Sequence, residues 1–127
     1  MKIYKFLIVL VFLFFYNCQK NISEINFINL YTTTITSVKC ENLKKAPSVK
    51  NVILSDEEND KLLNNFSKLK PAPNGLNIDA RVYGSIYDGS KKLDFCSGIG
   101  VIEINNKKYL VDKYLRDNLI TLTQGKR

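Results

Sequence analysis

The chain has 127 residues, of which 45% are hydrophobic and 24% are charged, and these proportions are ordinary for a globular domain. This length is enough for one domain of usual size and too short for two. Histidine is absent and the formal net charge is +7. The missing histidine excludes Ser-His-Asp triads, Cys-His pairs and zinc sites with a histidine ligand.

The chain begins with a short basic segment and an apolar run. Lys2 and Lys5 form a short positive region, and the chain that follows is uninterruptedly apolar from Phe6 to Tyr16. A membrane-spanning helix needs about 20 apolar residues, whereas this shorter run suits the hydrophobic region of a signal peptide. The alternative is a buried helix of the folded domain, but such a helix would carry polar residues at helical spacing. We therefore expect residues 1–17 to be a signal peptide.

A cysteine follows closely after this run. The basic start, the apolar core and Cys18 resemble the precursor of a bacterial lipoprotein. In that family a diacylglycerol is attached to the cysteine, and signal peptidase II cuts just before it. The resemblance covers about the first 18 residues. Phe15, Tyr16 and Asn17 depart from the usual lipobox, which has Leu and then two small residues, and are closer to the looser lipoboxes of AT-rich, Bacteroidetes-like bacteria.

The resemblance implies an exported protein whose partner is a membrane, reached through the lipid on Cys18. Residues 18–24 would then be a lipidated tether, and two or more acyl chains would hold it durably. Gln19 follows the cysteine, which by the sorting rule of enteric bacteria favours the periplasmic face of the outer membrane. The alternative is an uncleaved or conventionally cleaved signal, with Cys18 incidental.

Cleavage before Cys18 would leave 110 residues and lower the formal net charge to +5, because two lysines would be removed. The remaining basic residues are scattered among acidic ones, and arginine is scarce. Nucleic-acid binding requires a focused basic surface. We therefore expect no nucleic-acid partner and, beyond the membrane, a protein partner.

The first half of the domain combines two strands and a helix. Residues 25–38 are rich in β-branched and aromatic residues, which predicts a strand, and residues 51–54 predict a short second strand. Residues 41–50 form a polar connection. Ser55 and Glu58 have the spacing of a capping box, and the prolines at positions 71 and 73 end the helix that follows. Its apolar stripe consists of Leu62, Leu63, Phe66 and Leu69.

Strict alternation from residue 77 to residue 87 predicts a strand with one core face. That face would carry Ile78, Ala80, Val82, Gly84 and Ile86. Asp88-Gly89 predicts a turn before a strand over 93–97, and Gly98 and Gly100 indicate a bulge, a kink or a close backbone approach. Gly98-Ile99-Gly100 lies between strands, so it does not have the context of a phosphate-binding loop.

The C-terminal part predicts a hairpin and a final helix. A strand over 101–104 leads into Asn105-Asn106, residues that favour a tight turn, and 107–111 should fold back. Asp112 is a candidate N-cap for a helix with Leu115, Leu119 and Leu122 on one side, although residues 119–123 also suit a strand. The order of elements predicts a single α+β domain over residues 25–127, with an antiparallel sheet of about five strands and two helices.

Two cysteines remain in the expected domain. Export would place Cys40 and Cys96 in an oxidising compartment, where a pair of cysteines indicates a disulfide. Closing a loop of this length stabilises by roughly 4 kcal/mol in the chain-entropy model. The alternative is a reactive cysteine, which here would lack a histidine partner and a C-x-x-C spacing.

The polar face of the 77–87 strand is the candidate binding surface. Arg81, Tyr83 and Tyr87 lie on it, and tyrosine and arginine are enriched in interface hot spots. The alternatives are that Asp79 simply pairs with Arg81 and that the tyrosines pack beneath a helix.

The function expected from these features is a noncatalytic binding or interaction module anchored in the envelope. No catalytic residue, metal site or cofactor is expected. A histidine-free enzyme and a purely structural envelope lipoprotein are the alternatives. A concave pocket with two converging carboxylates, or an ionisable group with a shifted pKa, would favour the enzyme. A shallow or filled surface with an exposed patch of tyrosine and arginine would favour binding.

Overall fold

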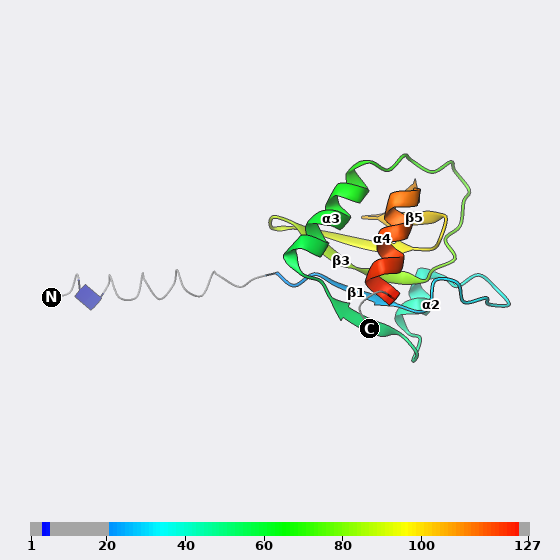
Figure 1. Cartoon of the computed structure of the whole chain (residues 1–127), viewed down its shortest axis with the longest axis horizontal. Coiled ribbons are helices and arrows are strands. Elements are labelled where there is room, and N and C mark those ends of the chain that lie inside the picture. Colours follow the sequence, from blue (N-terminus) through cyan, green and yellow to red (C-terminus); the bar gives the residue numbers. More distant parts are fainter. Residues whose placement is uncertain (1–3, 6–20, 125–127) are drawn as a thin grey trace.

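The computed structural model describes residues 4–5 and 21–124, so that Cys18 and most of the expected signal peptide lie outside the described residues. The described part contains one antiparallel sheet with the strand order β2-β1-β3-β4-β5-β6 (Figure 1). The strands are β1 (Glu24–Phe27), β2 (Lys50–Ile53), β3 (Val82–Asp88), β4 (Lys91–Ser97), β5 (Val101–Ile104) and β6 (Lys107–Leu110). The helices are α2 (Cys40–Lys44), α3 (Asp56–Ser67) and α4 (Lys113–Gln124). The predicted α+β class is confirmed, with six strands where about five were expected and with α2 as an additional short helix.

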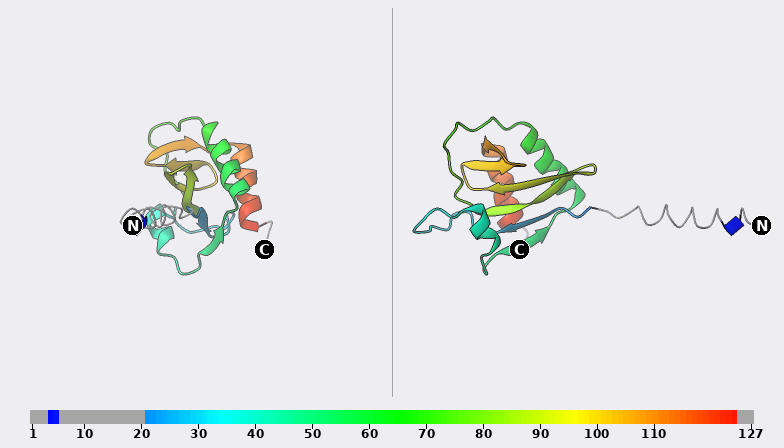
Figure 2. Two further views of the ribbon diagram at one scale, coloured as in Figure 1. Left: turned by 90° about the vertical axis from the view of Figure 1, so that its left-hand side faces the viewer. Right: turned by 180° about the vertical axis from the view of Figure 1, so that it is seen from behind.

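Helices α3 and α4 lie side by side on one face of the sheet, as the views in Figure 2 show. Phe66 of α3 meets Phe95 of β4 edge to face, with ring centroids 5.3 Å apart. Because the helices bury every second residue of the strands, the opposite face of the sheet is left for other contacts. The core between the helices and the sheet includes Ile25, Phe27, Leu62, Val82, Ile86, Ile102, Leu115, Leu119 and Leu122.

Both long helices begin where their capping residues predict. The Ser55 hydroxyl accepts a hydrogen bond from the Glu58 amide at 3.2 Å, and the Ser55 amide donates to the Glu58 carboxylate at 2.9 Å. Asp112 accepts a hydrogen bond from the Leu115 amide at 2.8 Å. Residues 119–123 are therefore helical, and the alternative of a strand there is wrong.

The predicted turns are also present. Gly89 has φ +61° between β3 and β4, while Asn105 and Asn106 have φ +46° and +69° between β5 and β6. The chain reverses between β4 and β5, so Gly98 stands in a hairpin loop. A Cβ atom on Gly98 would lie 2.4 Å from the carbonyl oxygen of Asp79, so of the three roles expected for this glycine it is the close backbone approach that holds.

Two strands are shorter in the structure than the sequence predicts. The strand expected over 25–38 ends at Phe27, and residues 31–37 form an exposed loop in which the Thr34 hydroxyl donates to the loop's own backbone. The strand expected from residue 77 begins at Val82. Ile78 and Ala80 leave the predicted core face and pack with Leu43, on the other side of the sheet.

The connection expected over 41–50 also differs, since it overlaps the short helix α2. Leu43 is fully buried there, with Ala80 and Cys96 as its neighbours in a second, smaller apolar cluster. Val38, Cys40 and Val49 pack against this cluster, which holds the polar stretch on the sheet.

Candidate binding face

A disulfide attaches α2 to the face of the sheet opposite α3 and α4, which we call the outer face. Cys40 of α2 and Cys96 of β4 are bonded, with their Cα atoms 6.1 Å apart and 56 residues between them in the sequence. This separation is within the range that a disulfide spans. The predicted pairing is confirmed.

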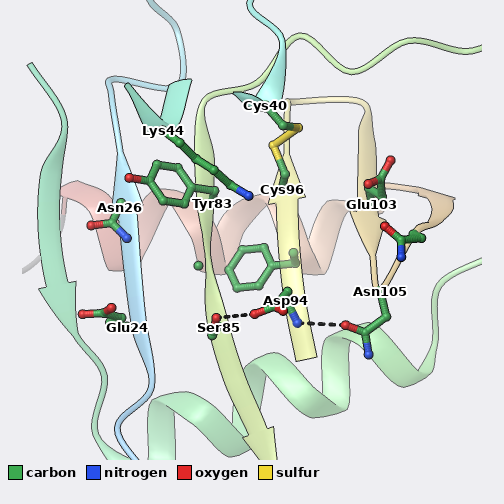
Figure 3. A pocket seen from close by; sticks show the side chains of 13 residues that line it. Glu24, Asn26, Cys40, Lys44, Tyr83, Ser85, Asp94, Cys96, Glu103 and Asn105 are labelled. Carbon is green, nitrogen blue, oxygen red and sulfur yellow. Dashed lines mark hydrogen bonds between the residues drawn. A yellow bond between two sulfur atoms is a disulfide. The ribbon is translucent and has the colours of Figure 1, made fainter. Parts of the chain in front are cut away.

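The rest of the outer face is open and forms a hollow of about 520 Å³ beside the disulfide (Figure 3). Its floor is the backbone of Gly84, where a Cβ atom would lie 2.2 Å from the carbonyl oxygen of Glu24. Only glycine fits at such a spacing. The polar side chains that line the hollow are Glu24, Asn26, Lys44, Tyr83, Ser85, Asp94, Glu103 and Asn105.

Strand register arranges these side chains in two rows across the sheet. One row runs from Glu24 through Ser85 to Asp94, and the other passes from Asn26 through Tyr83 and Cys96 to Glu103. Neighbouring strands lie about 4.8 Å apart, so Glu24 and Asp94 are separated by roughly twice that distance at their backbones. The carboxylates are thus spread over the hollow rather than brought together at one point.

Hydrogen bonds tie part of this surface together. The Ser85 hydroxyl donates to the Asp94 carboxylate at 2.6 Å, and the Asp94 amide donates to the Asn105 side chain at 3.0 Å. Both contacts are visible in Figure 3. On β1, the Asn26 side chain accepts a hydrogen bond from Asn51 at 2.8 Å. These bonds fix the side chains in place before any ligand arrives.

The hollow is acidic, although the protein as a whole is basic. Three carboxylates and one lysine ammonium line it, against a formal charge of +7 for the chain. Lys92 lies 3.7 Å from Asp94 and offsets that charge. Lys108 faces Glu103 in the strand register but donates its ammonium to the Leu76 carbonyl at 2.9 Å. With Lys44 and Lys92 set against three carboxylates, the hollow keeps an excess of one negative charge, on the side of Glu24 and Glu103.

The structure separates the three residues of the predicted binding patch. Tyr83 lines the hollow and packs against the cluster around Leu43, while Tyr87 lies further along the same face of β3, outside the hollow. Arg81 is 4% exposed and lies 2.7 Å from Asp79, the pairing that was the alternative interpretation. Its guanidinium also donates to the Thr32 carbonyl at 2.8 Å.

Asp79 shows the electrostatic effect of this pairing. Burial by itself raises the pKa of the Asp79 carboxyl, but a hydrogen bond from the Val38 amide and the hydrogen bond and charge of Arg81 lower it by more. The net effect is a pKa below the ordinary value of an aspartate. Asp79 therefore stays ionised and holds the buried guanidinium.

Sequence reasoning missed most of the hollow. Glu24, Asn26, Asp94 and Glu103 are polar residues that alternate with core residues in their strands. That alternation places them away from the core, but it does not say whether helices cover their face. Only the polar positions of four strands taken together indicate the hollow, because each strand alone shows just an ordinary polar face.

Within residues 4–5 and 21–124, no three Cys, Asp or Glu side chains are grouped so that they could hold a metal ion. No helix in this part of the chain has the length and apolar character needed to cross a membrane. No known family model matches the chain, and no curated protein or solved structure matches it either.

Proposed function

We propose that the protein is an exported lipoprotein, anchored to the envelope through Cys18, that binds a basic segment of a partner protein in the hollow of its outer face. The observation that carries the binding role is a preformed acidic hollow on an otherwise basic domain. Opposite charges speed the encounter of two partners and select the correct one.

The residues of the hollow support binding in preference to catalysis. A nucleophilic serine depends on an adjacent general base that a third group orients, and exclusion of water strengthens the electrostatic interactions of such a site. The Asp94 side chain, which accepts the hydrogen bond from the Ser85 hydroxyl, is 67% exposed. A rigid, open and polar surface of this kind suits recognition of another surface.

The anchor is tested by intact-mass analysis of the protein isolated from its native envelope. We expect a chain that begins at Cys18 and carries acyl chains. In a Cys18→Ser variant, the protein should leave the membrane fraction. An unmodified N-terminus beyond residue 18 would reject the anchor and leave the binding role to be judged by itself.

The binding role is tested by calorimetric titration of the full-length protein in detergent with a lysine-rich decapeptide. The double variant Glu24→Gln/Glu103→Gln should bind at least about ten-fold more weakly, and added salt should weaken the wild type. Asp60→Asn/Asp117→Asn is the matched control, because it removes two exposed carboxylates from α3 and α4 on the opposite side of the sheet. Equal losses in both double variants, or no binding by the wild type, would contradict the proposal.

One contact favours a second candidate function, a histidine-free hydrolase. The 2.6 Å hydrogen bond from Ser85 to Asp94 has the geometry of a nucleophile and its base. A fluorophosphonate probe distinguishes the two functions, since an activated serine would be labelled and a Ser85→Ala variant would not. We expect no labelling of the wild type.

A further inference from the structure

An uncharged loop projects from the end of the molecule opposite the one at which the stretch 21–124 begins. The segment that leads into β1 lies at one end, and residues 31–37 extend beyond the sheet at the other, in both views that show the long axis (Figures 1 and 2). We call this segment the projecting loop. Tyr31 is 60% exposed in it, and Ile35 at its bend is fully exposed at 105%.

The incoming limb of the projecting loop is held by a buried charge. Two nitrogens of Arg81 donate to the Thr32 carbonyl, Nε at 3.2 Å and Nη2 at 2.8 Å, and Nη2 also lies 3.4 Å from the Thr34 hydroxyl. Arg81 is itself fixed by both oxygens of Asp79, at 2.7 and 3.0 Å. Hydrogen bonds from a charged donor are the strong ones.

The outgoing limb is held by the same ion pair. The carboxylate of Asp79 accepts a hydrogen bond from the Val38 amide at 2.8 Å, and the Val38 carbonyl accepts one from the Ala80 amide at 2.8 Å. Two residues later the chain reaches Cys40 and its disulfide to Cys96. Both limbs are thus tied to one short stretch of the protein, residues 79–81.

A side chain also fixes the tip. The Thr34 hydroxyl donates to the Thr36 carbonyl at 2.7 Å, across Ile35. A loop braced in this way has already lost much of the conformational freedom that binding would otherwise remove, and preorganisation of this kind raises affinity. Ile35 belongs to neither apolar cluster, so its side chain is presented to water and contributes nothing to the described core.

We propose that the projecting loop docks in the substrate cleft of an endopeptidase that has an apolar primary pocket, with Ile35 as the anchoring side chain. The loop is convex and uncharged, which fits a narrow cleft, and it carries one aliphatic side chain at its bend. Complexes of this type form between partners that are rigid before they meet. The limbs remain tied to Asp79 and Arg81, so a cut at the tip would not release the ends, and hydrolysis would be slow.

The test measures inhibition of three endopeptidases with aliphatic or aromatic preference, of the elastase, subtilisin and chymotrypsin types, by the full-length protein in detergent. At least one should be inhibited with micromolar or tighter affinity. Ile35→Asp should raise the inhibition constant about 100-fold, and Thr34→Val, which removes two braces but keeps the fold, should raise it about five-fold to ten-fold. Trypsin should not be inhibited, because the projecting loop contains no Lys or Arg.

Ile53→Asp is the matched control, since Ile53 is a second exposed isoleucine, at 65%, on the edge strand β2. It should leave inhibition unchanged. The Glu24→Gln/Glu103→Gln variant should also inhibit normally, which separates the projecting loop from the hollow. Absence of inhibition in all three enzymes, equal effects of the two aspartate substitutions, or rapid cleavage after Ile35 would overturn the proposal. Binding of lipid vesicles that depends on Ile35 would assign the projecting loop to a membrane and would overturn it as well.

Discussion

Arg81 is the residue on which the most local contacts converge. Its guanidinium joins Asp79, the backbone of Thr32 and the Thr34 hydroxyl, although it is almost completely buried. A buried charge is strongly destabilising when its partner is removed. Sequence alone predicted that Asp79 and Arg81 could pair, because they are two apart on one strand. It could not predict that Arg81 also holds the backbone of a residue 49 positions earlier, since that contact depends on the fold.

Asp79 should therefore make the free energy of unfolding depend on pH. The folded-state pKa of Asp79 is lowered, so its contribution is present above the unfolded pKa of about 3.9 and is lost as pH falls through the folded pKa. Asp79→Asn should lower the free energy of unfolding at pH 7 by about 1–3 kcal/mol and reduce its loss on acidification below pH 4. Urea titrations at pH 7, 5 and 3 measure both effects. Asp60→Asn on the exposed side of α3 should change neither.

At the scale of elements, the helices and turns were predictable because their signals are local. A capping serine, an aspartate before an apolar stripe and a pair of asparagines each act within four residues of chain. The strand expected over 25–38 failed because β-propensity says only that a segment suits a sheet. Pairing partners were available to Glu24–Phe27, between β2 and β3, and not to the threonines that follow.

The close spacing of strands β1 and β3 depends on Gly84, so a substitution there tests how these two elements pack. In Gly84→Ala the new Cβ atom would lie 2.2 Å from the Glu24 carbonyl oxygen, a backbone atom that cannot move without shifting β1. We expect a loss of about 1–3 kcal/mol in the free energy of unfolding, measured by urea denaturation. Gly100→Ala is the control, because nothing lies within 4 Å of its Cβ position. Similar losses for both would show that the strand spacing is not the cause.

At the scale of the whole molecule, the hollow exists because α3 and α4 cover one face of the sheet and α2 covers only part of the other. Alternation in each strand predicted a core face and a polar face, and α+β organisation predicted helices grouped on one side. Neither could predict that α2 covers one end of the other face and leaves the hollow beside it. That arrangement depends on Leu43 and on the disulfide, which act between residues far apart in the chain.

The disulfide lies in the smaller of the two apolar clusters, and we expect the two parts of the molecule to differ in stability. Its cysteines belong to the small cluster around Leu43, whereas the main core between α3, α4 and the sheet contains neither of them. Reduction, or the double variant Cys40→Ala/Cys96→Ala, should lower the free energy of unfolding by about 2–5 kcal/mol. Hydrogen exchange should then rise first in α2 and in residues 31–38, while amides of β3, β4 and α4 stay protected.

The same variant bears on both proposed surfaces, because α2 forms one wall of the hollow and the disulfide follows the outgoing limb of the projecting loop. We expect weaker binding of the lysine-rich peptide and weaker inhibition in the reduced protein, with the main core still folded by circular dichroism. Uniform loss of protection in all strands and helices would contradict this division. It would mean that the Cys40–Cys96 bond stabilises the sheet itself and not only helix α2 on its outer face.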